Sequence, residues 1–390
     1  MNRHVIRDLQ GGSDQTGLRD QNARLVLSYI RRHGALAGAE IARRSGLSAQ
    51  TVSNILRALQ ADGLVAKGDA VKGKVGKPSV PVALNPVGAH AVGLNIGRRS
   101  AEFVLVDFLG TPLSEFAVSY PFPTPDCVFP FLSRCLRDAL AAHPEAATTL
   151  AGVGVSMPFR LWEWHQIVEA PEGDMDAWRS LDVAAEVEAV TGRVPVIQND
   201  ATSACVAEHL LGRGHEYLDF AYLFVGAFIG GGLVLNGKVV EGRTGNAGAF
   251  GPLPVPDGLG GTRQLLTTAS LYTLEARLKD AGGNADALRE ASADWHALGA
   301  ALDDWIAATA RDLAIAAAAA VSIVEIEAVL IDGAVPRWVA ERLVAGVADE
   351  LDRIDMTGVE KPTILLAEVG ASARALGAAL LPIHARYFPA

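Results

Sequence analysis

The chain has 390 residues, half of them apolar and a fifth charged, which is the composition of a folded protein of two or three domains. This composition excludes disorder as the main state, and 40 glycines without a three-residue period exclude collagen. Cys127, Cys135 and Cys205 are too far apart for a CxxC metal site or a disulfide framework. We therefore expect buried free thiols in a reducing cytoplasm.

Charge is distributed unevenly along the chain. Residues 1–80 hold 13 Lys and Arg against 6 Asp and Glu, whereas residues 81–390 hold 21 against 38. A basic head, residues 1–80, on an acidic body, residues 81–390, suggests that only the head contacts a polyanion. The alternative is that the difference in charge is an accident of surface composition. The first 20 residues have no apolar run, and the most apolar stretch, 313–324, is too short to span a bilayer. We expect a cytoplasmic protein without membrane contact.

Three helices are predicted at the start of the chain, over residues 21–32, 39–45 and 49–61. Ala42, Gly46 and Val52 have the spacing of a helix-turn-helix. The small residue lets two helices approach, the glycine adopts the positive φ of the turn, and the β-branched residue packs at the crossing. Ser48 is placed to cap the third helix, and Gly63 to end it.

The third helix turns a polar face away from its apolar residues. Short polar side chains of this kind read base edges in a DNA major groove, and arginine contacts phosphate. The alternative is the solvated face of a packing module. The predicted DNA-contacting residues of this region are Ser48, Gln50, Thr51, Ser53, Asn54 and Arg57.

A glycine- and lysine-rich segment follows between two predicted strands, 64–67 and 80–84. Strands that flank such a tip are typical of the wing of a winged helix. We expect Lys72, Lys74 and Lys77 to contact DNA phosphates or the minor groove, although a run of lysines is often only a solvated loop.

The rest of the chain repeats one α/β pattern twice. Each half opens with antiparallel strands and continues with alternating helices and strands, which predicts a duplicated fold of two lobes with a cleft between them. Asn236-Gly237 has the composition of a type I′ turn. The expected strands are 91–97, 102–107, 114–118, 150–156, 194–197, 220–225, 230–240, 328–331 and 363–366, and the expected helices are 127–142, 183–190, 201–211, 269–279, 295–321 and 371–386.

Seven motifs appear in the order found in one family: Gly97, 153–158, 198–201, 226–232, 245–248, Asp332-Gly333 and Gly370. From about residue 22 onward the chain resembles the repressor branch of the ROK family. The resemblance implies an α/β protein in which a winged helix-turn-helix precedes a two-lobed actin/hexokinase-like (RNase H-like) ATPase fold. It divides the chain into a tail, 1–18, a DNA-binding domain, 19–86, and an effector-binding and oligomerisation body, 87–390.

ROK kinases hold ATP phosphates in two loops, and both loops differ here. In the kinases the first loop is Asp-x-Gly followed by a small residue and Thr. This chain has Asn95 in place of the Asp, and Arg98 and Arg99 follow Gly97 in place of the small residue and the Thr. The second is Gly-Thr-Gly-Ile-Gly, where this chain places Phe228 among its glycines. We therefore expect no ATP binding and no catalytic residues.

The zinc site and part of the sugar pocket of ROK kinases are also replaced. Pro252 stands at the position of the zinc-binding histidine, and Asp257, Leu259 and Gln264 at those of the three cysteines. No zinc and no metal ligands are expected, so hydrogen bonds and packing must hold this loop. The two sugar-binding glutamates correspond to Ala249 and Leu266.

The Asn-Asp pair of the sugar pocket is retained as Asn199 and Asp200. The resemblance implies that Asp200 accepts hydrogen bonds from hydroxyls of a sugar-like effector and that Asn199 donates one. The alternative is that Asp200 only caps the following helix. An aromatic group nearby either stacks on a sugar or packs the lobe: Phe159, Trp162, Trp164 and Trp178, with Arg160 and His165.

These observations predict a transcriptional regulator, a repressor of carbohydrate-related genes. Its partners would be double-stranded operator DNA, a sugar or sugar-derivative effector and further copies of itself, as a homodimer or homotetramer. The alternative function is a ROK sugar kinase that phosphorylates a hexose or amino sugar with ATP.

Overall fold

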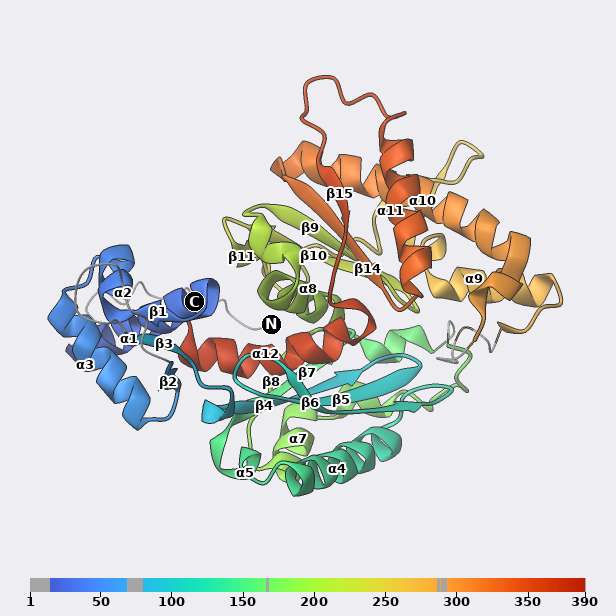
Figure 1. Cartoon of the computed structure of the whole chain (residues 1–390). Coiled ribbons are helices and arrows are strands. Elements are labelled where there is room, and N and C mark those ends of the chain that lie inside the picture. The colour runs from blue at the N-terminus through green and yellow to red at the C-terminus, as the bar shows by residue number, and fades with distance from the viewer. Residues whose placement is uncertain (1–14, 69–79, 166–167, 286–287, 289–292, 390) are drawn as a thin grey trace.

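The computed structural model describes residues 15–68, 80–165, 168–285, 288 and 293–389. Lys72, Lys74 and Lys77 lie outside the described residues. Figure 1 shows a small head at one side of a larger body that consists of two lobes.

The head is a three-helix unit with a small antiparallel sheet in the order β1-β3-β2. Gly46 has a φ of 71° between the second and third helices, and its N–H donates to the Ala42 carbonyl, as the predicted turn requires. The first helix begins at Gln15, before the predicted residue 21. The elements are α1 (Gln15–His33), β1 (Leu36–Ala37), α2 (Gly38–Ser45), α3 (Ala49–Ala61), β2 (Val65–Lys67) and β3 (Pro81–Leu84).

The first lobe is built on a five-stranded sheet in the order β6-β5-β4-β7-β8, with β6, β5 and β4 antiparallel and the others parallel. Helices α4 and α7 pack on each other below this sheet, and the C-terminal helix α12 covers its other face (Figure 1). The elements are β4 (His90–Ile96), β5 (Ser100–Val106), β6 (Pro112–Ser119), α4 (Pro125–Ala142), α5 (Ala146–Thr149), β7 (Leu150–Met157), α6 (Ala177–Ser180), α7 (Val183–Thr191), β8 (Val196–Asn199) and α12 (Ala373–Tyr387).

The second lobe repeats this topology in a sheet of order β11-β10-β9-β14-β15, which confirms the predicted duplication. Asn236 and Gly237 both have positive φ, 53° and 68°, as a type I′ turn requires. The elements are α8 (Asp200–Leu211), β9 (Phe220–Val225), β10 (Ile229–Leu235), β11 (Lys238–Val239), β12 (Pro254–Pro256), β13 (Thr262–Gln264), α9 (Leu271–Asp280), α10 (Gly299–Val324), β14 (Ala328–Gly333), α11 (Arg337–Leu351) and β15 (Thr363–Leu366).

The longest apolar helix of the body is longer than the sequence pattern indicated. Among the described residues, Trp295–Val324 is the one helical stretch long and apolar enough by composition to cross a membrane. More than half of its most apolar window is buried in the protein. Within this stretch α10 packs on α9 and α11, as a core helix of a folded lobe does.

Helices α8 and α12 lie side by side between the lobes and run in the same direction, from the cleft toward the head (Figure 1). Gly377 of α12 touches the backbone of Ser203 on α8, and a Cβ there would collide with the Ser203 carbonyl. On the other side of α12, Gly93 of β4 and Gly154 of β7 touch its backbone at Ala375 and Ala378. Glycine is therefore required on both sides of α12 by close approach.

We predict that Gly377→Ala lowers the free energy of unfolding by about 1–3 kcal/mol, because the added methyl group forces two backbones apart. Gly38→Ala in α2 is the matched control, since its Cβ meets only Leu56 at an ordinary 3.4 Å. Thermal unfolding of both variants measures the effect. Equal melting temperatures for Gly377→Ala and the wild type would show that the two helices separate without cost.

Candidate DNA-binding and ligand-binding sites

Helix α3 presents the polar face that its sequence pattern predicts. Val52, Ile55, Leu56 and Leu59 are buried against the rest of the head. The side chains that point outward from α3 are Gln50, Ser53, Asn54 and Arg57, which are exposed, and Thr51, which is half-buried.

Hydrogen bonds link several polar side chains at the start of α3 and along its exposed face. Ser48 is the N-cap of α3, as predicted, since its hydroxyl accepts from the Thr51 N–H at 3.1 Å and lies 2.8 Å from the Thr51 hydroxyl. Gln50 donates to the Asn54 side-chain oxygen at 3.2 Å. The hydroxyls of Ser48 and Thr51 therefore hold the start of the helix, while Gln50, Asn54 and Arg57 face solvent.

The head rests on the body through a buried arginine that the sequence analysis did not identify. The Arg31 guanidinium lies 4.8 Å from the centre of the Phe388 ring, just beyond the end of α12. Neither of its terminal nitrogens has a hydrogen-bond partner among the described residues, and burial lowers its pKa to about 10. Burial, then the charges of Arg31 and His209, lowers the pKa of His384 to about 4. Residues from α1, α8 and α12 thus meet at one charged junction.

At the opposite end of α8, Asn199 and Asp200 lie at the cleft between the lobes. Asn199 is the N-cap, because its side-chain oxygen accepts from the N–H groups of Ala201 at 3.0 Å and Thr202 at 3.3 Å. Asp200 is the first helical residue, is buried, and leaves the cap to Asn199. The alternative that Asp200 caps the helix is therefore wrong, and its carboxylate faces the cleft.

The nearest charged neighbour of Asp200 is Arg98, from the turn between β4 and β5. A terminal nitrogen of Arg98 lies 3.8 Å from the Asp200 carboxylate. Its guanidinium carbon lies 4.0 Å from the centre of the Trp164 ring and 4.7 Å from that of Phe228. Because Phe228 belongs to the second lobe, this stack connects the two lobes across the cleft.

Two bulky side chains meet at the segments that correspond to the phosphate loops of ROK kinases. Arg98 and Phe228 stand where the resemblance places small residues in the two phosphate loops of the kinases, and the Arg98 guanidinium lies over the Phe228 ring. Burial lowers the pKa of Arg98 to about 10, so the group remains charged at neutral pH.

A hydrogen-bonded network lies beside this stack. Glu102 accepts from Arg374 at 3.0 Å, from Ser100 at 2.9 Å and from Asn95 at 2.9 Å. Ser156 in turn donates to Asn95. The network fixes the start of α12 to the first lobe, and Asn95, where kinases have an acid, is one of its members.

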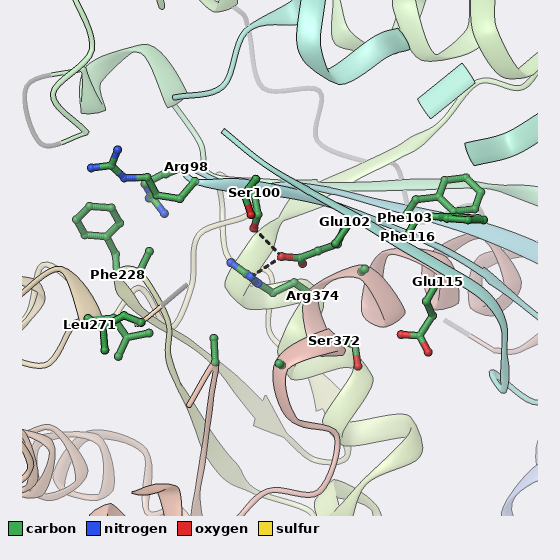
Figure 2. Close-up of a pocket in the computed structure, with 18 of the residues that line it drawn as sticks. Arg98, Ser100, Glu102, Phe103, Glu115, Phe116, Phe228, Leu271, Ser372 and Arg374 are labelled. Carbon is green, nitrogen blue, oxygen red and sulfur yellow. Dashed lines mark hydrogen bonds and ion pairs between the residues drawn. The ribbon is translucent and has the colours of Figure 1, made fainter. Parts of the chain in front are cut away.

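A cavity of about 580 Å³ extends from the stack between the lobes. Figure 2 shows Arg98 and Phe228 at one end, Phe116 and Glu115 at the other, and Arg374 between them. A second, smaller space of about 30 Å³ is lined by Arg98, Asp200, Phe224 and Arg374. Both spaces share the side chains of Arg98 and Arg374.

The predicted aromatic group separates into two parts. Trp178 is buried in the first lobe and donates to the Pro123 carbonyl, and Trp162 packs on the same core. Phe159 lies against Gly245 at the cleft, and Trp164 carries the Arg98 stack. Outside the cleft contacts, Arg160 pairs with Glu163, and His165 bonds the Trp162 carbonyl.

A carboxylate that the sequence pattern did not mark, Glu241, is bonded to Gln198, the residue before Asn199. The Gln198 side chain donates to Glu241 at 3.2 Å, and its own oxygen lies near Gly245. Ala249 is exposed, and Leu266 is buried in the second lobe. Both side chains are apolar, so neither supplies a carboxylate. Glu241 precedes the 245–248 motif by only four residues, but no spacing rule marks it.

The loop that corresponds to the ROK zinc site forms the β12–β13 hairpin. Asp257 accepts from the N–H groups of Leu259 at 2.7 Å and Gly261 at 2.9 Å, and this lowers its pKa. Leu259 is 93% exposed and carries no ligand atom. The donor set does not fit zinc, and the part of the chain that is described holds no cluster of three His, Cys, Asp or Glu suited to a metal.

The sequence matches the ROK family over residues 91–385 and the MarR family over residues 16–74. The xylose repressor of Bacillus subtilis (strain 168) is 21% identical over 62% of this chain and 62% of that protein. The DNA-binding transcriptional dual regulator NagC of Escherichia coli (strain K12) is 26% identical over 63% of this chain and 61% of NagC. The chain thus spans less than two thirds of the length of these curated relatives.

Among solved structures, the chain is similar to that of a ROK family transcriptional regulator, a homolog of the E. coli MLC protein. The TM-score is 0.69 at 20% sequence identity, over 95% of this chain and 97% of that chain. This likeness confirms the predicted fold, a winged helix-turn-helix followed by a two-lobed kinase-like body.

Proposed function

The chain belongs to the ROK family and carries a MarR-like winged helix, and from this we propose that it is a DNA-binding repressor of carbohydrate-related genes. The proposal is carried by the combination of an exposed polar face on α3 with a cleft in which Arg98 and Phe228 replace small residues of the kinase phosphate loops and contact each other. The first feature suits DNA, and the second suits a body that binds a ligand without phosphorylating it.

The effector is a sugar or sugar derivative in the cleft beside Asn199 and Asp200. Two relatives support a sugar, since one is the xylose repressor named above and another, 26% identical to this chain, is an N-acetylglucosamine repressor of Escherichia coli O6:H1. The Asp200 carboxylate accepts from hydroxyls, and the Asn199 amide nitrogen donates, because only the amide oxygen is used by the helix cap.

The DNA partner is a duplex operator with two half-sites. A single helix-turn-helix reads one half-site, so a homodimer or a homotetramer of this chain supplies the second head about one DNA turn away. In this assignment Gln50 and Asn54 contact base edges, Arg57 contacts phosphate, and Lys72, Lys74 and Lys77 add phosphate contacts from outside the described residues.

We predict that Asn54→Ala weakens binding to an operator selected from random duplexes by about 1–3 kcal/mol and changes nonspecific binding little, because a base contact is lost. Arg57→Ala should weaken binding to all sequences and reduce the salt dependence by about one counterion. Affinity measured across a salt series distinguishes the two effects.

Arg43→Ala is the matched control for Arg57, because Arg43 is exposed on α2 but its guanidinium is bonded to Glu40. It should bind the operator like the wild type. If a chain lacking residues 1–85 bound the operator as tightly as the full chain, the head would not be the DNA-binding domain.

The effector signal has a short path from the cleft to the head. Helices α8 and α12 begin at the cleft with Asp200 and near Arg374, and their other ends meet Arg31 of the head. A ligand that favours one arrangement of the lobes therefore acts on the head through two helices in backbone contact. A tenfold preference for the arrangement that does not bind DNA corresponds to about 1.4 kcal/mol.

We predict that Asp200→Ala abolishes the response to an effector found in a panel of sugars and sugar derivatives, and leaves ligand-free operator binding nearly unchanged. The reason is that the hydroxyl acceptor is lost while the Asn199 cap remains. Asp182→Ala is the control, since Asp182 is a carboxylate that caps α7. Operator affinity with and without the effector is measured in all three proteins, and a normal response in Asp200→Ala would place the ligand elsewhere.

The second candidate function, a ROK sugar kinase, is favoured by the retained Asn199 and Asp200. The Arg98 and Phe228 side chains oppose it, because phosphoryl transfer depends on placing a metal–nucleotide complex. Incubation with ATP, magnesium and a panel of hexoses and amino sugars should yield no phosphorylated sugar. Robust turnover of any of these sugars would replace the repressor assignment.

A further inference from the structure

The charged junction between the head and the body consists of side chains that are cations or can become cations. The Arg31 guanidinium of α1 lies over the Phe388 ring, and the His384 ring of α12 stacks on the same ring, with 5.8 Å between the two ring centres. His209 of α8 completes the group, because it lies close enough for its charge to act on His384. Three elements thus bring one guanidinium and two imidazoles together around Phe388.

Among the described residues, no carboxylate balances these groups. Both terminal nitrogens of Arg31 are enclosed without a hydrogen-bond partner in the described part of the chain. The charged groups that act on His384 are Arg31 and His209, and those that act on His209 are Arg31 and His215. All of these groups carry positive charge when they are charged, so protonation of either imidazole meets repulsion alone.

The carboxylates on the neighbouring elements are bonded elsewhere. Glu216, in the turn after α8, pairs with Arg213 at 3.0 Å. Glu208 of α8 accepts hydrogen bonds from three backbone N–H groups. The exposed neighbours on α1 and α12 add basic groups and no acid: Arg32, His33 and Arg386.

The hydrogen bonds of His209 show where an added proton would go. Its Nε2 lies 3.1 Å from the Gly237 carbonyl oxygen, which only accepts, so Nε2 carries the proton of the neutral ring. Its Nδ1 is therefore a lone pair, and this atom is enclosed with no partner in the described residues. A proton on Nδ1 would create a buried charge beside Arg31 and an N–H group without an acceptor.

Docking of the head and protonation of the imidazoles therefore oppose each other. An imidazole in water has a pKa of about 6.5. Burial in the docked structure, and then the charges of Arg31 and His209, lower the pKa of His384 to about 4. The docked form thus binds fewer protons than the released form. Its stability is complete above about pH 6.5 and falls as the pH decreases through 6.5 toward 4.

We propose that the charged junction is a proton-sensitive switch, in which protonation of His384 and His209 favours release of the head from α12 and weakens operator binding. The inference rests on the proposed function for the operator, and on the cluster of basic groups for the release. Two heads must stay about one DNA turn apart to contact two half-sites, and a released head does not hold that spacing.

The size of the effect follows from the protons bound in the two states. If release hydrated His384 fully, the docking equilibrium would shift by about tenfold between pH 8 and pH 5.5. The burial that α8 and α12 themselves provide persists after release. We therefore expect a shift of about threefold.

Titration of the imidazoles in the DNA-free full chain tests the junction itself. The ring signals of the nine histidines are followed by nuclear magnetic resonance from pH 8 to pH 5, and the signal lost in His384→Gln identifies His384. We expect its pKa to lie clearly below 6.5 and to rise in Arg31→Met, because Arg31 reaches His384 only while the head is docked. An ordinary pKa in the wild type, or an unchanged one in Arg31→Met, would overturn the switch.

Operator affinity at pH 7.5 and pH 5.5 tests the consequence. On acidification the wild type should lose about threefold more affinity than His384→Gln, whose side chain takes up no proton. His384→Lys carries a permanent charge and should bind weakly at both pH values, and adding Arg31→Met to it should restore part of the affinity. His296→Gln is the matched control, because His296 is exposed and stacks on Trp338 in the second lobe, and it should keep the wild-type pH dependence.

The outcomes separate this switch from the proposed function. His209→Gln provides a second neutral variant if His384→Gln fails to fold. Equal pH dependence in the wild type and both neutral variants would overturn the switch, while operator binding itself would stand. An Arg31-dependent low pKa of His384 in a chain that binds no operator would keep the proton-coupled docking and remove the repressor assignment. Loss of the pH dependence in His296→Gln as well would reduce the effect to general charge on DNA and overturn the switch.

Discussion

The direct backbone contact between α8 and α12 is the constraint on which the other parts of this molecule depend. Gly377 allows α12 to touch α8 at Ser203, and Gly93 and Gly154 allow the first-lobe sheet to touch α12. Because α8 also packs on the second-lobe sheet, the two helices join the lobes to one another. Glu208 of α8 adds further connections, because its buried carboxylate accepts hydrogen bonds from the N–H groups of Arg213, Glu368 and Val369.

Most of the fold was accessible from sequence because its signals are local. Hydrophobic periodicity located the strands and helices of both lobes, and Gly46 and Asn236-Gly237 marked turns that need positive φ. The α3 face followed from helical geometry alone. Element boundaries moved by a few residues, most at α1, where the apolar stripe begins later than the helix itself.

The contacts that define the sites were not accessible in this way. Arg98, Trp164, Asp200 and Phe228 come from four separate segments. Only the folded chain shows that Arg98 stacks on the two rings and lies beside Asp200. The sequence marked Arg98 as a lost kinase residue but could not show what the arginine touches. The cap of α8 was ambiguous for another reason, since Asn and Asp cap equally well and only backbone geometry separates them.

The junction at Arg31 has a consequence for how firmly the head is held. Among the described residues, the two terminal nitrogens of this guanidinium have no hydrogen-bond partner that replaces their lost hydration, and that loss offsets part of the apolar contact around Arg31. Undocking would return the charge to water. Desolvation of this charge therefore weakens the attachment of the head to the body at the Arg31 junction.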